Sequence, residues 1–224
     1  HLEFLGASLD GRALAAREVS LDAEGLSIAA VPEAFTLETA GRFDPWKNTR
    51  LEGLYASKDG LFTQCEAEGF RTITWYPDRP DVMARYRVRI HAPKDEFPQL
   101  LSNGNLVGEG DEADGRHFAE WEDPFPKPSY LFAMVAAKLE RVEDTFVTAS
   151  GRKALLQVYV EPGKLDQAGF ALQCLKRSMR WDEERFGREL DLERFMIVAV
   201  GDFNMGAMEN KGLNIFNTKY VLAR

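Results

Sequence analysis

Two patterns of apolar and polar residues divide the chain near residue 138. Before that point, short apolar or alternating runs follow one another, as is typical of antiparallel β-structure. The runs are separated by turn signals: Asp10-Gly11, Lys58-Asp59-Gly60 and Asn103-Gly104. Val82–Ile90 alternates most regularly, with apolar residues on one face and three arginines on the other. Many short strands at this spacing predict a sandwich or a saddle-shaped open sheet.

A proline-rich stretch and the two chain ends give further expectations about the fold. Asp123–Pro128 contains three prolines, which lack backbone donors, so we expect an ordered connection there and not a central strand. It leads into Tyr130–Ala137, which is predicted to be a buried strand. The chain begins with the strand-like His1–Leu5 and ends within the apolar run Tyr220–Arg224. Because natural domains seldom begin or end inside an element, we expect a piece of a longer protein.

After residue 138 the pattern becomes α+β. Thr145–Val160 is predicted to form a pair of strands. Apolar residues then recur at helical spacing from about Leu165 to Phe186, and Gly187 is a suitable helix end. Two further strands are predicted at Arg194–Val200 and around Leu213–Phe216. The fold class is therefore mainly β with an α+β C-terminal part.

Composition and charge narrow the classes of protein. We predict two domains, residues 1–138 and 139–224, in a chain of 224 residues that is 45% hydrophobic. The longest apolar run, Tyr130–Ala137, is far shorter than the roughly 18–20 residues of a membrane span. A net charge of −8 repels phosphate backbones and anionic lipid, so neither nucleic acid nor a membrane is an expected partner.

Cysteines and histidines offer little chemistry. Cys65 and Cys174 form neither a C-x-x-C motif nor a disulfide framework, and no signal peptide is visible, which favours a cytoplasmic location. The acidic neighbour of Cys65 would raise the pKa of its thiol, making it a poor nucleophile. His1, His91 and His117 stand far apart, without an H-E-x-x-H motif, and are interpreted as surface histidines. No zinc site is expected within this sequence.

The candidate chemistry lies in the stretch Gly201–Gly212, where an apolar strand gives way to small residues and then to a carboxylate. Gly206 and Ala207 leave the backbone bare, so that a peptide could pair with it as an added strand. Glu209 could then bind a positive group at the end of that peptide. The glycines could equally just turn the chain and leave Glu209 solvated, and spacing alone favours this second interpretation.

A second acidic stretch surrounds Cys65. Strand alternation would place Gln64 and Glu66 on one face and Cys65 on the other. Two polar side chains that share a face with another acid could hold an ammonium group. A solvated strand end is the alternative, and composition alone favours it.

Four stretches resemble the zinc aminopeptidases of the aminopeptidase N type, in their bacterial form. They are the GAMEN motif Gly206–Asn210 within Asn204–Ala223, then Gln64–Arg71, Asp123–Pro128 and Met179–Gly187. The resemblance covers nearly the whole chain and is weakest before about residue 48. It implies a β-rich N-terminal domain followed by the first strands and helix of a thermolysin-like catalytic domain. In that family the zinc ligands lie downstream of GAMEN, so zinc is expected in a full-length parent and not in this chain, which is predicted to be inactive alone.

The resemblance also implies roles for individual residues. Glu209 would bind the free α-amino group of the substrate, with Glu66 as its partner acid, and the Glu66–Ala67 peptide bond would be cis. Gln64 and Met205 would line the pocket for the first side chain, and the Gly206–Ala207 backbone would bind the peptide. The substrate-binding residues implied are Gln64, Glu66, Met205, Gly206, Ala207, Met208, Glu209 and Asn210.

The activity implied is the zinc-dependent removal of a neutral or basic N-terminal residue, such as alanine, from peptides with a free N-terminus. The parent is expected to be cytoplasmic and monomeric. One alternative is an epoxide hydrolase with residual aminopeptidase activity, although Ala207 and Glu66 resemble the plain peptidase branch. The other is a β-sandwich module that binds peptides without catalysis. An HExxH motif shortly after Arg224 would decide for the enzyme.

Overall fold

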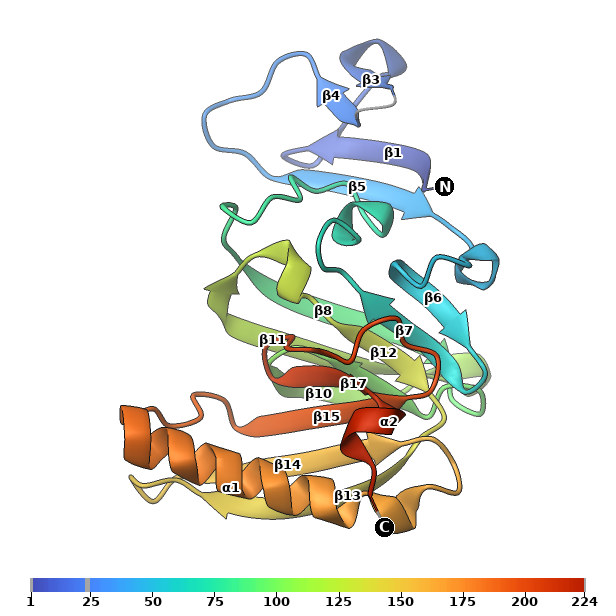
Figure 1. The fold of residues 1–224 in the computed structure, drawn as a ribbon. Coiled ribbons are helices and arrows are strands. Elements are labelled where there is room, and N and C mark those ends of the chain that lie inside the picture. Colours follow the sequence, from blue (N-terminus) through green and yellow to red (C-terminus); the bar gives the residue numbers. More distant parts are fainter. Residues whose placement is uncertain (1, 23–24, 224) are drawn as a thin grey trace.

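The computed structural model describes residues 2–22 and 25–223 (Figure 1). Two small sheets lie at the N-terminal end. One has the order β2-β1-β5, formed by β1 (Glu3–Leu9), β2 (Arg12–Ala13) and β5 (Leu37–Arg42), and the other is the hairpin β3 (Val19–Leu21) and β4 (Leu26–Ile28). The predicted first strand thus begins at Glu3, and the predicted turn at Asp10-Gly11 is confirmed by positive φ angles of 49° and 79°. His1 and Arg224 lie outside the described residues.

Two larger sheets make up the middle of the chain. A four-stranded sheet with the order β6-β7-β12-β9 is formed by β6 (Gly53–Ser57), β7 (Gly60–Gln64), β9 (Gln99–Ser102) and β12 (Met134–Ala137). A three-stranded sheet with the order β10-β11-β8 is formed by β8 (Ala84–Pro93), β10 (Asn105–Asp111) and β11 (Arg116–Lys127). The predicted alternation along β8 is confirmed, because its three arginines are exposed between more buried neighbours.

Two sequence predictions are wrong in this region. The first concerns Asp123–Pro128, which was expected to be a connection and not a central strand. Most of it belongs to β11, which is the central strand of its sheet and continues to Lys127. The register passes from Asp123 opposite Tyr86 directly to Lys127 opposite Ala84, so the two prolines between them fall in a bulge and need donate no ladder bond.

The predicted strand Tyr130–Ala137 is shorter than expected. Residues 129–131 form a 3₁₀ turn, and the strand begins only at Met134. The side chain of Asn103 explains the difference, because its Oδ1 accepts from Ala133 N at 2.8 Å and its Nδ2 donates to Leu131 O at 3.0 Å. Side-chain bonds therefore take the place of a strand ladder before Met134.

The C-terminal part is a five-stranded mixed sheet. Its order is β13-β14-β15-β17-β16, formed by β13 (Glu140–Val147), β14 (Lys153–Val160), β15 (Arg194–Val200), β16 (Ala207–Met208) and β17 (Leu213–Asn217). β14 runs parallel to β15 and β15 runs parallel to β17, while the outer pairs are antiparallel. The predicted strand Arg194–Val200 is confirmed at both ends. The described chain ends with the short helix α2 (Thr218–Val221).

The helix α1 (Gly169–Phe186) joins the parallel strands β14 and β15. A 3₁₀ turn over residues 165–167 precedes it, so only the first turn of the predicted helix differs. Gly187 ends the helix as predicted, with a left-handed φ of 63° and its N–H directed at the Asp182 and Glu183 carbonyls. Ala168, Leu172 and their apolar successors pack on the sheet, which confirms the predicted stripe.

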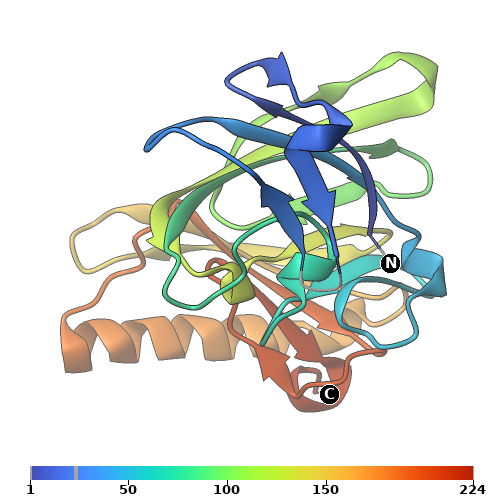
Figure 2. The same cartoon turned by 90° about the horizontal axis from the view of Figure 1, so that it is seen from above.

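Alternating residues of the C-terminal sheet belong to two cores. Ile197 and Ala199 pack with α1, whereas Met196 and Val198 join a cluster that includes Tyr55 and residues of the four-stranded sheet. Figure 1 accordingly shows α1 on the face of the sheet away from the N-terminal strands, and Figure 2 gives the view from above. The mainly β fold with an α+β C-terminal part is confirmed, and the division into two domains at residue 138 stays a prediction.

Candidate functional site

The predicted site is centred on residues 201–212, which we call the glycine-bounded segment. It connects β15 to β17 and contains β16. Its first half is held by β6, because the Tyr55 hydroxyl donates to Asp202 O at 3.0 Å and the Ser57 hydroxyl donates to Asp202 Oδ2 at 2.8 Å. Asn204 Nδ2 also donates to Arg50 O at 2.8 Å. Burial raises the pKa of Tyr55, and the Asp202 charge adds to the effect, so this hydroxyl remains a donor.

The second half of the segment is held at Lys211. Its main-chain oxygen accepts a 2.8 Å hydrogen bond from Asn103 Nδ2. Its ammonium pairs with Asp191 at 2.9 Å and lies 4.5 Å from the centre of the Phe125 ring. Gly212 follows with a φ of +73°, and a Cβ there would lie 2.6 Å from Leu192, so this glycine is required by the fold.

β16 forms an open edge of the five-stranded sheet. Ala207 pairs with Phe216 and Met208 with Ile215, while Asn217 N donates to Gly206 O at 3.0 Å. β16 is the last strand of the sheet, so its other side has no neighbouring strand among the described residues. Such an edge can accept an extended peptide by main-chain hydrogen bonds.

Gly206 differs from Gly212. It has no left-handed φ, and an added Cβ would come no closer than 3.6 Å to the Tyr220 ring, which is ordinary contact. Neither backbone conformation nor packing within the described residues therefore requires a glycine at this position. The smallest side chain at the open edge leaves the backbone accessible to a ligand.

Exposed and buried side chains alternate along the second half of the segment. Met205, Ala207 and Glu209 are exposed, whereas the side chains of Met208 and Asn210 are buried. The Asn210 carboxamide is 1% exposed, and neither its nitrogen nor its oxygen has a hydrogen-bond partner among the described residues. The exposed side of the segment therefore presents the Glu209 carboxylate and the Met205 thioether.

Gln64 and Glu66 lie at the end of β7, but they do not share a face of a strand. β7 ends at Gln64, and the turn that follows contains a cis Glu66–Ala67 peptide bond, as the resemblance implies. Gln64 and Cys65 are both buried and Glu66 is exposed, so the predicted alternation is wrong. Gln64 Nε2 nevertheless donates to Glu66 O at 3.2 Å, and its buried Oε1 has no partner among the described residues.

The two acids of the predicted site, Glu66 and Glu209, have unpaired carboxylates. Among the residues that the structure describes, neither side chain makes a hydrogen bond or an ion pair, with the other or with a third residue. Met208, which precedes Glu209, and Phe62 of β7 belong to one buried cluster. Both carboxylates are exposed and could therefore bind a cation.

The structure buries Cys65 and gives His91 and His117 polar partners. The pKa of the Cys65 thiol is raised, but by burial first and then by the Asp78 charge, so the expected influence of Glu66 is wrong. His91 Nδ1 lies 2.8 Å from Glu112 Oε2, and His117 Nε2 lies 2.8 Å from Phe97 O, as suits hydrogen-bonded surface histidines. His1 lies outside the described residues. Within residues 2–22 and 25–223, no group of three or more His, Cys, Asp and Glu side chains could hold a metal ion.

Sequence reasoning missed the residues that position the segment. In the sequence, Asn103 is only part of a turn signal, although in the structure it is 2% exposed and its side chain donates to Lys211 O. Tyr55 carried no signal beyond strand propensity. Asp202 lay within the candidate stretch, but its partners are more than 140 residues away in sequence.

The chain is similar to known peptidases along most of its length. The model of the peptidase M1 N-terminal domain matches residues 15–131, and that of the peptidase family M1 domain matches residues 170–224. Aminopeptidase N of Caulobacter vibrioides is 60% identical over 99% of the chain, and aminopeptidase N of Escherichia coli is 60% identical over 89%. The chain spans only 26% and 23% of these two relatives.

A solved structure gives the same assignment. Aminopeptidase A of Legionella pneumophila, in complex with aspartic acid, matches 99% of the chain with a TM-score of 0.94 and 36% identity. The chain covers 26% of that protein. The chain therefore belongs to peptidase family M1 and corresponds to its N-terminal domain and the beginning of its catalytic domain.

Proposed function

We propose that this chain supplies the amine-anchoring part of a zinc-dependent aminopeptidase that removes a neutral or basic N-terminal residue, such as alanine, from peptides. One observation carries the proposal. The open edge at Gly206–Ala207 stands beside the exposed, unpaired carboxylate of Glu209, in a chain that belongs to family M1. The geometry suits a peptide that ends in an ammonium group.

Glu209 and Glu66 would bind the substrate ammonium together. Each carboxylate can accept a charge-assisted hydrogen bond from the ammonium group, which makes the contact stronger than a neutral hydrogen bond. The scissile carbonyl lies one Cα from the ammonium, so anchoring the amine also fixes the carbonyl in position. A segment from the interior of a protein has no ammonium and would leave both acids unpaired, which explains a preference for chain ends.

The remaining predicted residues would hold the rest of the peptide. The backbone of Gly206 and Ala207 would bind the peptide main chain at the sheet edge. The exposed Met205 and the carboxamide of Gln64 would line the pocket for the first side chain. The partnerless Oε1 of Gln64 supports this role, because a buried acceptor without a donor is costly unless a ligand supplies one.

The metal would be held by residues other than those described. Aminopeptidases of family M1 are generally zinc enzymes, but the described residues do not fit a zinc site, because they contain no suitable group of ligands. Glu209, Glu66, and the Gly206–Ala207 backbone would bind the peptide without contacting the metal. No helix among the described residues is long and apolar enough to cross a membrane. We place the enzyme in the cytoplasm as a monomer, acting on peptides and not on nucleic acid.

Matched substrates test the proposal on the full-length enzyme that contains this chain. Alanyl substrates with a free or an acetylated α-amine differ only in the cation that the two acids would bind. We expect the free amine to be required for hydrolysis, with a fall in kcat/KM of at least about a hundredfold on acetylation. Equal rates on both substrates would contradict the anchoring role.

A further inference from the structure

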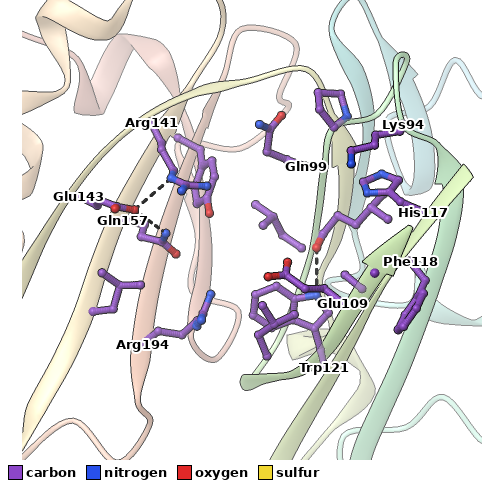
Figure 3. Close-up of a pocket in the computed structure, with 18 of the residues that line it drawn as sticks. Lys94, Gln99, Glu109, His117, Phe118, Trp121, Arg141, Glu143, Gln157 and Arg194 are labelled. Carbon is purple, nitrogen blue, oxygen red and sulfur yellow. Dashed lines mark hydrogen bonds and ion pairs between the residues drawn. The ribbon is translucent and has the colours of Figure 1, made fainter. Parts of the chain in front are cut away.

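A cleft of about 480 Å³ lies between the two halves of the chain, away from the glycine-bounded segment. One wall comes from β9, β10 and β11, and the other from β13, β14 and β15 (Figure 3). None of the residues predicted to bind the amine lines it. Its volume is that of a site for a small molecule.

Two pairs of charges at the cleft are already compensated. Lys94 Nζ lies 2.5 Å from Asp111 Oδ1, and Arg141 Nε lies 3.0 Å from Glu143 Oε2. The pKa of Glu143 is lowered, first by a hydrogen bond from Gln157 and then by its arginine neighbours. These four side chains therefore need no further partner.

One cation and one anion remain. Among the described residues, Arg194 and Glu109 make no hydrogen bond and no ion pair, although the charge of Arg194 contributes to lowering the pKa of Glu143. The Arg194 guanidinium lies over the Trp121 ring, 5.2 Å from the centre of the ring. This contact holds the guanidinium in place and leaves its N–H groups available as donors. Figure 3 shows Arg194 and Glu109 on opposite walls of the cleft. The cleft therefore presents a guanidinium and a carboxylate, and neither of them makes a hydrogen bond within the described residues.

Gln157 adds a buried acceptor to the wall that carries Arg194. The residue is 3% exposed, and its Nε2 donates to Glu143 Oε2 at 2.9 Å. A carboxylate can only accept, so the amide nitrogen must face Glu143, and the oxygen must face away from it. Oε1 has no partner among the described residues, and Figure 3 shows the Gln157 amide at the edge of the cleft. A ligand that supplies an N–H donor would satisfy it.

We propose that this cleft binds a short peptide with both termini free, a dipeptide being the smallest. Its carboxylate pairs with Arg194, its ammonium pairs with Glu109, and its peptide N–H donates to Gln157 Oε1. Such a peptide reaches all three groups at once, whereas a simple anion would reach Arg194 alone and a simple cation Glu109 alone, and neither would supply a donor to the buried amide oxygen. The site is separate from the anchoring segment and does not depend on the function proposed for that segment.

Blocked peptides test the proposal on the intact 224-residue chain by isothermal titration calorimetry. Glycylglycine has both charges, its N-acetyl form lacks the cation, and its C-terminal amide lacks the anion. We expect glycylglycine to bind in the millimolar range or tighter, and each blocked form to bind about tenfold more weakly or worse. Equal affinity for all three peptides, or no binding of glycylglycine, would overturn the proposal.

Variants assign each charge to its partner. In Glu109→Gln, acetylation should no longer weaken binding, and in Arg194→Gln, amidation should no longer weaken it. Arg194→Lys keeps the charge and serves as the matched control. Glu109 is an exposed strand residue, so its variant tests the proposal even if the arginine variant does not fold. If Glu209→Gln removes the effect of acetylation instead, the peptide binds at the anchoring segment. That result would overturn this inference while supporting the proposed function.

Discussion

Asn103 and Lys211, which are 108 residues apart in the chain, are joined by a 2.8 Å hydrogen bond from the asparagine Nδ2 to the lysine main-chain oxygen. The same buried side chain bonds the main chain at Leu131 and Ala133. A single carboxamide therefore connects the four-stranded sheet to the end of the glycine-bounded segment. The position of that segment depends on contacts that no local sequence pattern contains.

Asn103→Ala should destabilise the protein. It removes three hydrogen bonds and leaves the buried main-chain groups without partners, at a cost of about 3 kcal/mol in the free energy of unfolding. Urea unfolding measures this loss. Asn105→Ala is the control, because Asn105 accepts one exposed bond from Glu193 N at 2.9 Å and its loss should cost well under half as much. Equal losses would show that the Asn103 network adds nothing to an ordinary surface contact.

Glu209→Gln should lower kcat/KM in the full-length enzyme. The variant keeps the shape of the side chain and removes the charge, and a charge-assisted contact is worth roughly 1.5–3 kcal/mol, or about ten- to a hundredfold. Zinc content should not change, because Glu209 is not proposed as a ligand. Kinetics on paired substrates with and without the α-amine decide the question. If both substrates lose the same factor, Glu209 supports the fold or the chemistry and does not anchor the amine.

Gly206→Ala and Gly212→Ala should differ in what they damage. A Cβ on Gly206 meets only ordinary contacts, so the free energy of unfolding should change by less than about 1 kcal/mol. The added methyl group at the open edge should nevertheless lower kcat/KM by about tenfold. A Cβ on Gly212 would clash with Leu192 in a left-handed conformation and should cost about 2 kcal/mol or more. Thermal unfolding and kinetics on both variants separate the effects. Unchanged kinetics in Gly206→Ala would argue against peptide pairing at this edge.

The two cysteines should react at different rates with a thiol reagent. Cys174 is partly exposed, whereas Cys65 is buried and the pKa of its thiol is raised by that burial and by Asp78. Native protein should therefore be labelled at Cys174 alone, and denatured protein at both positions. Cys174→Ser supplies the control, since its native form should then be unreactive. Rapid labelling of Cys65 in the native protein would contradict the burial of its side chain.

Zinc should not bind stoichiometrically to the 224-residue chain. The expectation follows from the absence of a suitable group of ligands among the described residues. Metal analysis after dialysis, with a parallel assay on an aminoacyl arylamide, provides the measurement. One tightly held zinc per chain, together with hydrolysis that a chelator abolishes, would show that the chain carries a complete site.

Regular elements were predictable from the sequence because their signals are local. The run Arg194–Val200 matches a strand at both ends, and Gly187 ends α1 where a left-handed residue is needed. Predictions failed where a distant partner or an irregular backbone decides the structure. Side-chain bonds from Asn103 shorten the strand after Tyr130, and a bulge lets β11 continue through two prolines.

The candidate site was predictable in part for the same reason. The extended edge at Gly206–Ala207 follows from bare backbone next to a strand, and the structure does contain β16 there. The orientation of Glu66 was not predictable from alternation, because β7 ends at Gln64 and a turn follows. The roles of individual residues toward a substrate stay predictions that rest on the resemblance to the zinc aminopeptidases.

The shortness of β16 has a consequence for the range of substrates. A strand of two residues, Ala207–Met208, offers main-chain bonds to only the first few residues of a peptide. Main-chain hydrogen bonds are the same for nearly every amino acid. A peptide bound in this way would therefore be selected by its first side chain and not by the sequence that follows. Each cleavage would also expose a new terminus identical in its backbone to the last. Under the proposed function, an enzyme with this edge would shorten unrelated peptides one residue after another, until a first residue no longer fits its pocket.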